Sequence, residues 1–337
     1  MDAMPNSTTD DSSEIFARVT WDWFSIVKVT LAIFGILGNA LVIVVYIKKL
    51  RNSNSNQLIA ILAIADLLTS VATIPKPSLL VVPNTAAGKA YCKIIESDVI
   101  MWISIVASIF TLTLLSLERY FAVVRPLKHR SAFNKARLRY YVVSVWISAL
   151  ALNVASFYVT HVSDDNACVL IWPSPAFQRF YGVTLFIVEF MIPVAVMVVS
   201  HFHAIRELKK QADALLARNE SQSSPAFSLL RSRRLVIRMV LIVVITFIVC
   251  WAPDQIGFLV LNLGGLSPSY FGSLTYRCLT VLAFINSCAN PIIYICLNKN
   301  FRAGVVKLNP CSARGKVGVS SEEGTATIRL PGGPPTG

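Results

Sequence analysis

The segment Glu118-Arg119-Tyr120 ends a long apolar stretch of this chain, and the segment Asn290-Pro291-Ile292-Ile293-Tyr294 lies inside the last such stretch. An arginine beside a glutamate is costly at the edge of a hydrocarbon layer. A proline inside a membrane helix removes a backbone hydrogen bond, so neighbouring groups have to support the helix there. Because both costs occur in separate apolar stretches, we interpret the two segments as parts of a switch.

The composition indicates a protein that spans a membrane several times. Of the 337 residues, 55% are hydrophobic and only 15% are charged, and the mean hydropathy is +0.61. A soluble domain would have about 25% charged residues. The net charge of +13 is also compatible with a nucleic-acid binder. However, the basic residues gather in alternate connections between the apolar stretches, as in cytoplasmic loops, so we expect no nucleic-acid partner.

Seven apolar segments are each close to the roughly 20 residues that a membrane-spanning helix needs. They cover residues 24–47, 58–82, 99–123, 140–158, 180–202, 235–263 and 274–297. The predicted fold is therefore an all-α membrane protein, a bundle of seven transmembrane helices. Basic residues follow the first, third, fifth and seventh segments, which places the N-terminus outside the cell and the C-terminus inside.

The predicted organisation has four parts. Residues 1–23 form an extracellular segment with a glycosylation sequon at Asn6, and residues 24–297 form the transmembrane domain. Residues 298–308 are short and amphipathic, so we expect a helix that contacts membrane lipids at the inner surface. Residues 309–337 are rich in Gly, Ser and Pro, as in disordered cytoplasmic tails.

The cysteines fit this topology. Cys92 and Cys168 are the two cysteines in outer connections, where they face an oxidising compartment, so we predict a disulfide between them. This bond would tie the second outer loop to the top of the third span. Cys311, just after the predicted surface helix, is a candidate for palmitoylation, although an unmodified thiol is equally compatible.

The motifs resemble those of the rhodopsin-like family of G-protein-coupled receptors over about residues 24–308. The matching segments are Gly38-Asn39, Leu62-Ala63-Ile64-Ala65-Asp66, Glu118-Arg119-Tyr120, Pro126-Leu127, Trp146, Pro193, Cys250-Trp251-Ala252-Pro253 and Asn290-Pro291-Ile292-Ile293-Tyr294. Each motif alone is weak, but together they occur in the expected order and spans. The resemblance implies a plasma-membrane receptor that activates a heterotrimeric G protein.

The resemblance places a switch in the inner half of the bundle. Arg119 is similar to the residue that pairs with its neighbouring acid in the idle receptor and is freed towards the G protein in the active one. Ile109, Pro193 and Phe247 match a packed trio beneath the ligand pocket, for which core packing alone is the simpler role. The expected coupling residues are Glu118, Arg119, Tyr120, Ile109, Pro193, Phe247, Trp251, Pro253, Asn290, Pro291 and Tyr294.

Two positions depart from the family's pattern. The inner end of the sixth span has Arg233 where many members have an acid that holds the arginine. We therefore expect Arg233 to repel Arg119 and the idle state to be weakly locked. His201 stands where the family usually has a tyrosine that turns towards the arginine, and the charge of a histidine depends on pH.

Asp66 is a carboxylate within a membrane span, so it needs a partner. By the resemblance it faces Ser108, Asn286, Ser287 and Asn290, all of which offer oxygen atoms. Such a set suits a small hard cation, and we expect a bound sodium ion there. The alternative is a neutral, hydrogen-bonded aspartic acid with water.

Acidic side chains dominate the presumed ligand pocket. Asp98, Glu189 and Asp254 lie in or near spans three, five and six, and acids inside a membrane mark functional sites. For any single acid, a structural hydrogen bond is an equally good explanation. Together they favour a cationic or amide-rich ligand, which acids outside the membrane would steer inward. The predicted ligand-binding residues are Asp98, Met101, Glu189, Trp251, Asp254, Gln255 and Tyr276.

Other ligand classes fit less well. The seventh span has Phe284 where an opsin has its retinal lysine, and the third has Met101 where amine receptors have an aspartate. The motifs are most similar to those of neuropeptide receptors of the somatostatin, galanin and allatostatin type, so we expect a short basic or amidated peptide. A small amine or a lipid is the alternative within the family.

One spacing departs from the family in the outer half. Cys92 and Arg119 are 27 positions apart (119 − 92), which is longer than usual. Either the third span begins with an irregular turn, or Asp98 is rotated away from the position that we assign to it.

A membrane transporter is the alternative from another class. It predicts internal repeats and interrupted helices around a midplane site, and we see no repeat between the two halves of the chain. An enzyme has less support, because the sequence shows neither a nucleophile–base pair nor a metal-ligand cluster.

In the tail, we expect receptor kinases and arrestin to recognise phosphorylation sites, although solvated residues without a role are equally compatible. The candidate sites are Ser320, Ser321, Thr325 and Thr327.

Overall fold

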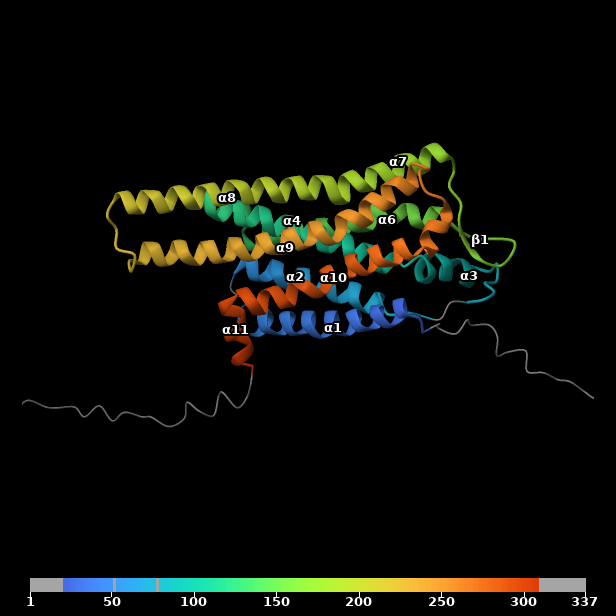
Figure 1. Cartoon of the computed structure of the whole chain (residues 1–337), viewed down its shortest axis with the longest axis horizontal. Helices are drawn as coiled ribbons and strands as arrows, with labels where there is room; N and C mark the ends of the chain where they lie inside the picture. Colours follow the sequence, from blue (N-terminus) through green and yellow to red (C-terminus); the bar gives the residue numbers. More distant parts are fainter. Residues whose placement is uncertain (1–20, 51–52, 77–78, 309–337) are drawn as a thin grey trace, which may run out of the picture.

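A computed structural model describes residues 21–50, 53–76 and 79–308 of the chain. The predicted sequon at Asn6, Cys311 and the candidate kinase sites lie outside these ranges. Within them, seven helices are long and apolar enough to cross a membrane. They run side by side along one axis (Figure 1), so the predicted seven-helix bundle is confirmed.

The third and fifth spans are built from several consecutive helical elements, whereas the other five spans are single helices. In chain order the elements of the spans are α1 (Trp23–Lys49), α2 (Asn54–Ala72), α3 (Ala86–Tyr91) with the π-helical turn η1 (Cys92–Glu96) and α4 (Val99–Val124), α6 (Lys135–Val159), α7 (Pro175–Leu185) with the π-helical turn η2 (Phe186–Met191) and α8 (Ile192–Ala217), α9 (Pro225–Asn262) and α10 (Leu274–Leu297). The remaining elements are α5 (Pro126–Ala132), β1 (Thr160–Val162), β2 (Cys168–Leu170), the 3-10 helix η3 (Pro268–Gly272) and α11 (Lys299–Val306).

Local sequence signals set several helix beginnings. The side chains of Asp22, Asn134 and Asn298 each accept a hydrogen bond from the backbone amide three residues later, at 2.9–3.1 Å. Such caps satisfy amides that the first helical turn leaves without partners. In α5, α7 and α9 the first residue is proline, which needs no partner for an amide there. These beginnings are therefore encoded locally.

Four span ends differ from the prediction by ten or more residues, and one of them is the start of the third span, at Ala86 instead of residue 99. α8 continues to Ala217 and α9 begins at Pro225, so most of the predicted inner loop between them is helical. Figure 1 shows both helices projecting past the rest of the bundle, and α9 alone is about 57 Å long. Hydropathy marks the edge of an apolar layer, but it does not mark the end of a helix. α2 ends at Ala72, ten residues before the predicted end at 82, because Pro75 disfavours helix at and before its position.

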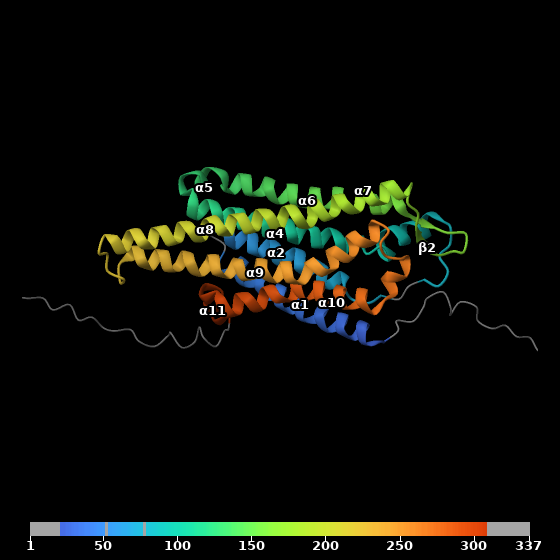
Figure 2. The ribbon, with the colours of Figure 1, turned by 45° about the horizontal axis from the view of Figure 1, so that its top comes forward.

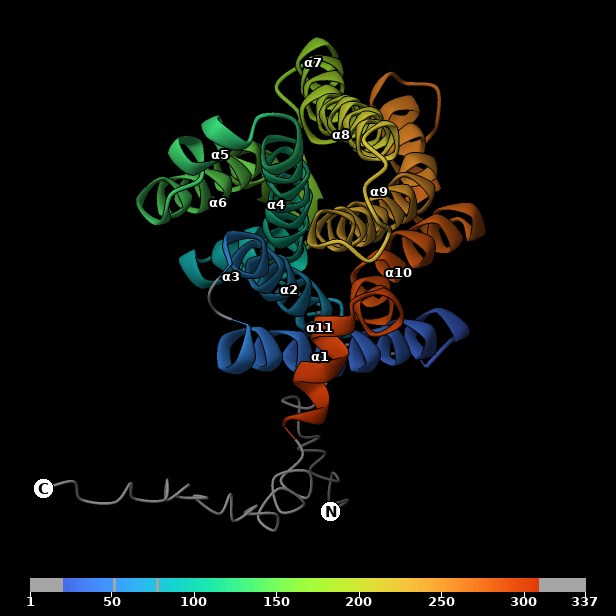
Figure 3. The same ribbon diagram turned by 90° about the vertical axis from the view of Figure 1, so that its left-hand side faces the viewer.

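The two ends of the bundle carry different features. At one end α11 turns across α1 and α10, and α8 and α9 project from this same end (Figures 1 and 2). At the other end lie α3 and the strands β1 and β2. Viewed along the bundle in Figure 3, α4 lies among α2, α6, α8 and α9, and it packs against all four. α4 is thus placed to connect the two ends.

A short antiparallel hairpin was not predicted. β1 and β2 pair with Thr160 opposite Leu170 and Val162 opposite Cys168. Each strand has three residues, which is too short for the alternation of polar and apolar side chains to be recognised in a sequence. The hairpin places Cys168 at the end of the bundle where the third span begins.

The helix α10 is supported by α1 at its internal proline. Pro291 has no amide proton, so the carbonyl of Ser287, four residues earlier, loses its helical donor. The side-chain amide of Asn39 donates to this carbonyl at 3.0 Å, from a fully buried position. Gly38 allows the close approach, because a Cβ atom there would lie 2.9 Å from the Pro291 side chain. The cost predicted for the Asn-Pro segment is thus offset by two adjacent residues of α1.

We expect Asn39→Ala to lower the thermal stability of the purified protein. The Ser287 carbonyl would be left buried without a side-chain donor, which costs about 1–3 kcal/mol. A matched control is Asn153→Ala, because Asn153 is also buried and its amide donates at 2.9 Å to Ala149 in its own helix. Thermal unfolding should show a clearly larger fall in Tm for Asn39→Ala. Equal falls for the two variants would contradict a special role for the contact with α10.

Candidate functional site

A buried carboxylate with three partners lies in the inner half of the bundle. Glu118 of α4 is only 1% exposed. The Nε and Nη2 atoms of Arg119 donate to its two oxygens at 2.6 and 2.7 Å. Ser55 of α2 donates to Glu118 at 2.9 Å and also accepts a hydrogen bond from Arg119. The ring of His129 of α5 lies 2.8 Å from the other carboxylate oxygen.

This arrangement holds Arg119 against its own helix. A two-pronged bond between arginine and carboxylate fixes the orientation of the guanidinium, and Ser55 adds a contact from a second helix. A buried carboxylate without partners would be costly, so Arg119, Ser55 and His129 also stabilise Glu118. The pair of Glu118 and Arg119 was predicted. Ser55 and His129 were missed, since only the packing of α2 and α5 on α4 brings them to Glu118.

The two positions that depart from the family pattern lie in different surroundings. Arg233 donates to Gln211 of α8 at 3.4 Å, and no described contact links it to Arg119. His201 is 2% exposed, and neither ring nitrogen has a hydrogen-bond partner among the described residues. The hydroxyl of Tyr294 in α10 is also buried and unpartnered within that part of the chain. Buried polar atoms need partners, so water or another arrangement of the helices has to satisfy these groups.

The predicted packing residues form one core in the middle of the bundle. Ile109, Phe247 and Trp251 are at most 5% exposed and belong to a single cluster of apolar side chains. Phe190 of η2 joins this cluster, with its ring centroid 6.2 Å from that of Phe247. Phe190 was not predicted, because its inward direction depends on the π-helical turn just before Pro193. The fifth and sixth spans are thus coupled through an aromatic pair.

Asp66 lies in the same layer of the bundle as the Asn-Pro segment. Its two oxygens accept hydrogen bonds from Ser108 and Asn290, each at 2.7 Å. The side chain of Ser287 also interacts with this carboxylate. The Oδ1 atoms of Asn286 and Asn290 are buried and lack partners among the described residues. All five predicted residues are buried, and the set of oxygen atoms, two of them unpartnered, fits a small hard cation.

The beginning of the third span explains its unusual spacing. The π-helical turn η1 is followed by Asp98, whose backbone is left-handed with a φ of 52°. The structure thus shows the irregular turn that was one of the two alternatives. The Asp98 carboxylate forms an ion pair with Lys76, which follows α2, and both side chains are about one-third exposed. Asp98 is therefore paired with a cation next to α2, whereas the sequence predicts it as an acid of the ligand pocket.

The other two pocket acids are buried and unpaired. Glu189 of η2 is 9% exposed and Asp254 of α9 is 8% exposed. Neither carboxylate has a hydrogen bond or an ion pair with the part of the chain that the structure describes. Tyr270 and Tyr276 lie near enough to Asp254 to interact with its charge, and their rings contact each other at 5.5 Å. Two buried acids thus lack the partners that buried charges require.

Other predicted pocket residues are also buried in the outer half. Gln255, next to Asp254, is 6% exposed, and its carbonyl oxygen has no partner within the described ranges. Met101 is 6% exposed, and its sulfur lies 3.9 Å from the Thr73 hydroxyl of α2. Trp251 lies one turn before Asp254 in α9 and is 3% exposed. Asp254, Gln255 and Trp251 therefore belong to one segment of α9.

Cations balance part of the acidic charge at this end of the bundle. Besides the pair of Lys76 and Asp98, Arg277 of α10 forms an ion pair with Asp22 at 2.7 Å. The backbone amide of Ser25 and the Arg277 guanidinium hold the pKa of the Asp22 carboxyl below its ordinary value. The negative charge that we expected to steer a basic ligand inward is therefore partly neutralised, which weakens the long-range attraction of such a ligand.

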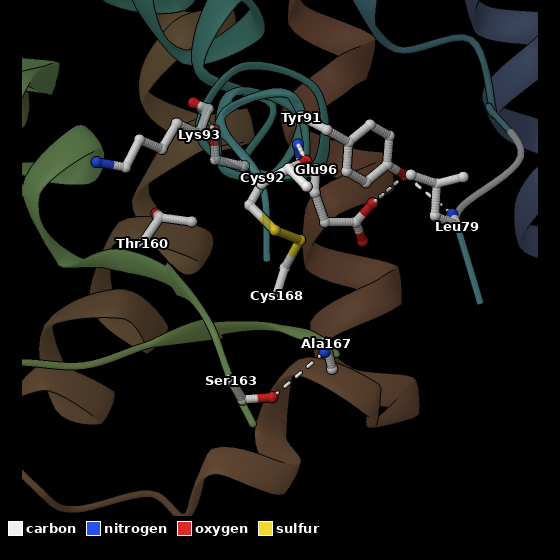
Figure 4. Close-up of a disulfide and its surroundings, with 12 residues drawn as sticks. Leu79, Tyr91, Cys92, Lys93, Glu96, Thr160, Ser163, Ala167 and Cys168 are labelled. Carbon is white, nitrogen blue, oxygen red and sulfur yellow. Dashed lines mark hydrogen bonds between the residues drawn. A yellow bond between two sulfur atoms is a disulfide. The ribbon is translucent and has the colours of Figure 1, made fainter. Parts of the chain in front are cut away.

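The predicted disulfide between Cys92 and Cys168 is confirmed. It joins η1 to β2, with a distance of 5.4 Å between the two Cα atoms (Figure 4). Next to it, the Tyr91 hydroxyl donates to Glu96 at 3.1 Å and accepts a hydrogen bond from the Leu79 amide. The disulfide fixes the hairpin to the irregular beginning of the third span.

Comparison with known proteins identifies the family. A family model described as 7 transmembrane receptor (rhodopsin family) matches residues 38–294. The chain belongs to this family. It is 30% identical to an allatostatin-A receptor from Bombyx mori, over 97% of this chain and 91% of the relative. It is 29% identical to galanin receptor 2a from Danio rerio (84% and 77%) and to a RYamide receptor from Drosophila melanogaster (90% and 68%).

These findings confirm the predicted likeness to receptors of the galanin and allatostatin type. They favour a receptor over a transporter, because the matched family model covers most of the transmembrane bundle. The protein is thus a multi-pass receptor of the plasma membrane. The cluster around Glu118 lies in the half of the bundle nearer to α11, and the buried acids Glu189 and Asp254 lie in the opposite half.

We expect Ser55→Ala to raise the activity of the receptor without ligand. Loss of the Ser55 hydroxyl removes one contact to Arg119 and one to Glu118, which weakens the hold on the arginine. A net loss of about 1 kcal/mol would shift the equilibrium roughly fivefold towards the active state. G-protein nucleotide exchange in membranes, measured without ligand, checks this.

The control is Ser116→Ala, because Ser116 is equally buried but bonds to Leu112 of its own helix at 3.0 Å. The two variants should be compared at equal surface expression. Unchanged basal exchange in Ser55→Ala, or the same increase in Ser116→Ala, would refute the role of Ser55 in holding Arg119.

Proposed function

We propose that this receptor binds a short basic or amidated peptide outside the cell and activates a heterotrimeric G protein inside it. The observation that carries the proposal is the pair of buried, unpaired carboxylates of Glu189 and Asp254. The relatives named above are receptors for allatostatin-A, galanin and RYamide, which supports a peptide ligand. A guanidinium, an ammonium or a terminal amide would supply the missing hydrogen-bond donors.

The two acids are placed to bind different parts of a ligand. Asp254 lies beside Gln255 and near Tyr276, so this side offers a carboxylate, an amide oxygen and a phenol. Glu189 lies in the π-helical turn η2 of the fifth span, among apolar side chains such as Phe190. A peptide with one basic group and further amide donors would satisfy both positions. Asp98 has a lesser role here, because Lys76 already neutralises it.

A ligand bound at Glu189 would affect the apolar core through Phe190, the next residue in the chain. A ligand that shifts η2 also shifts Phe190, whose ring packs on Phe247. Phe247 lies one turn before Trp251 in α9, and Pro253 follows at a point where the helix lacks one backbone hydrogen bond. A change in this packing therefore bends or rotates α9 at Pro253. The ligand drives the change only through its different affinities for the two arrangements.

The length of α9 turns a small rotation into a large displacement. From Pro253 the helix continues to Pro225, which is 28 residues or about 42 Å. Outward motion of this arm would open the inner end of the bundle next to Arg119. Arg119 would then leave Glu118 and contact the G protein together with Tyr120, the basic ends of α8 and α9, and α11. Release of the arginine would leave Ser55 and His129 as partners of the carboxylate.

We further propose that a sodium ion binds at Asp66. The residues that would hold it are Asp66, Ser108, Asn286, Ser287 and Asn290, which are all buried and come from α2, α4 and α10. The ion would supply a positive charge to a carboxylate that otherwise has only neutral hydrogen-bond donors. These residues orient the carboxylate and connect it to the supported Asn-Pro segment.

The orientation and the modifications complete the proposal. We place the end with the disulfide outside the cell, and the end with α11 inside, because Lys48 and Lys49 end α1 at that inner end. In this orientation Asn6 is available for glycosylation, and Cys311 is available for palmitoylation next to the membrane. Phosphorylation of the tail by receptor kinases would provide the negative charges for arrestin.

The ligand class can be tested with pairs of short peptides that differ only in one arginine or in its neutral isostere, citrulline. Asp254→Asn and Glu189→Gln should each weaken the arginine peptide roughly 10- to 100-fold, because a charge-assisted hydrogen bond is lost. The citrulline peptide should lose much less. Competition binding on membranes from expressing cells measures both affinities.

Asp98→Asn is the matched control, since it removes the same charge from an acid that is already paired with Lys76. It should reduce the affinity of the arginine peptide by less than either pocket variant. Equal losses for the arginine and citrulline peptides would indicate packing rather than charge recognition. A response to small amines that depends on the same two acids would move the ligand to the amine class.

We expect sodium to lower agonist affinity in the receptor, and Asp66→Asn to abolish this effect. The physical reason is that the amide cannot provide the negative charge that holds the cation. Agonist affinity is measured in sodium chloride and in N-methylglucamine chloride at the same ionic strength. The control Asp98→Asn should keep the sodium effect, and an Asp66→Asn receptor that keeps it would contradict the proposed ion site.

A further inference from the structure

A groove opens between the inner parts of α8 and α9. Its cavity has a volume of about 290 Å³. The apolar side chains that line it come from both helices and lie at helical spacing: Ile205, Leu208, Ile237 and Leu241. Three cationic side chains complete the lining: Lys209, Arg234 and Arg238. The surface of the groove is almost entirely apolar, so these three residues line it with their hydrocarbon stems rather than with their charged ends.

The groove lies where the bundle leaves the apolar layer. Leu208 and Ile237 belong to a small apolar cluster that also contains Val123. Val123 is the last residue but one of α4, so the floor of the groove is level with the inner end of that helix. Beyond this level α8 and α9 continue without the other spans beside them (Figure 1). The cationic groups therefore stand at the depth of lipid headgroups.

The groove opens away from the core of the bundle. Met239 and Val240 form the buried face of α9 at this level, whereas Arg234 and Arg238 are exposed on another face. Ile205 of α8 is 45% exposed. A membrane would therefore present its acyl chains to this opening, which is separate from the residues around Glu118.

The three cations have no acidic partner within the described residues. No ion pair or hydrogen bond of Lys209, Arg234 or Arg238 is present there. Glu207, a nearby acid of α8, accepts a hydrogen bond from Gln211 on the same helix and forms no ion pair with these cations. Three exposed cations without an acidic partner beside an apolar groove suit a ligand that has both negative charge and a hydrocarbon chain.

We propose that this groove binds one anionic phospholipid whose headgroup carries a phosphomonoester, such as a phosphoinositide. An acyl chain would lie on the apolar floor, and the phosphate would contact Lys209, Arg234 and Arg238. A free phosphate would leave the four apolar side chains unused. A headgroup with a single net charge would leave two of the three cations unpaired.

The lipid site is independent of the proposed peptide function. Only the assignment of the lipid to the inner leaflet rests on the proposed orientation. The cytoplasmic leaflet is the one that contains anionic lipids, and juxtamembrane basic residues are attracted to it. Because α8 and α9 both form the groove, its shape changes when α9 moves relative to α8. The lipid would therefore have different affinities for the two states of the receptor.

The test uses the purified full chain in neutral detergent micelles, without any agonist or G protein. Dioleoyl phosphatidylinositol 4-phosphate is titrated and bound lipid is counted by native mass spectrometry. We expect one saturable site, with much weaker binding of dioleoyl phosphatidylcholine and phosphatidylserine. Equal binding of phosphatidylserine would overturn the requirement for a phosphomonoester. This readout does not depend on ligand identity, so the proposed function and the lipid site can fail separately.

Two matched triple variants test the cationic side chains. Lys209→Gln with Arg234→Gln and Arg238→Gln should weaken lipid binding roughly 100-fold. The control replaces Lys210 of α8, Arg218 directly after α8 and Arg231 of α9 by Gln, which removes the same charge outside the groove. A variant with Lys209→Arg, Arg234→Lys and Arg238→Lys should retain binding and so show that charge is needed. Equal losses in the two Gln variants would mean diffuse attraction and would overturn the site.

A separate variant tests the apolar floor. Ile205→Trp should fill the opening and displace the lipid while all three cations remain, and its half-exposed position should tolerate the larger ring. Soluble inositol 1,4-bisphosphate, which has the charges but no acyl chain, should fail to displace the lipid at matching concentrations. Displacement by this headgroup, together with unchanged lipid binding in Ile205→Trp, would show a free-phosphate site and contradict the lipid proposal.

Discussion

A side-chain amide from α1 replaces the backbone hydrogen bond that Pro291 removes from α10. Asn39 donates to the Ser287 carbonyl, and this bond fixes α10 against α1 at the level of the proline. Asn290, directly before the proline, then donates to Asp66, and Ser108 of α4 donates to the other oxygen of Asp66. Four helices therefore meet in one polar layer. The outer acids and the inner arginine lie on opposite sides of this layer and depend on it for their positions.

The buried acids of this protein differ in whether other side chains of the protein pair with them. Glu118 has partners on both oxygens, supplied by α2, α4 and α5, so its charge is balanced within the protein. Glu189 and Asp254 are similarly buried but have no such partners within the described chain. The cost of burying a charge is offset at the inner end by the protein itself. At the opposite end this cost is not offset by the protein, and in the proposed function the ligand would offset it.

The fifth and sixth spans connect these two ends. Their contact at Phe190 and Phe247 lies between the unpaired acids and the arginine, and both helices continue well past the inner edge of the bundle. The same two helices form the cationic groove, so a lipid bound there would contact the elements that move. The bound ligand and the bound lipid would thus both act on the fifth and sixth spans.

The sequence by itself determined the seven spans, several helix beginnings, the disulfide and the pairing of Glu118 with Arg119. These features rest on hydropathy, on capping side chains and on neighbours in the chain, which are local properties. Only the tertiary structure decided that Asp98 turns to Lys76, that η2 directs Phe190 to Phe247, and that α8 and α9 project so far. It also brought Ser55 to Glu118 from 63 positions away. The physical reason is that such contacts depend on how separate helices pack, and the apolar pattern of each helix does not specify which residues of another helix it meets.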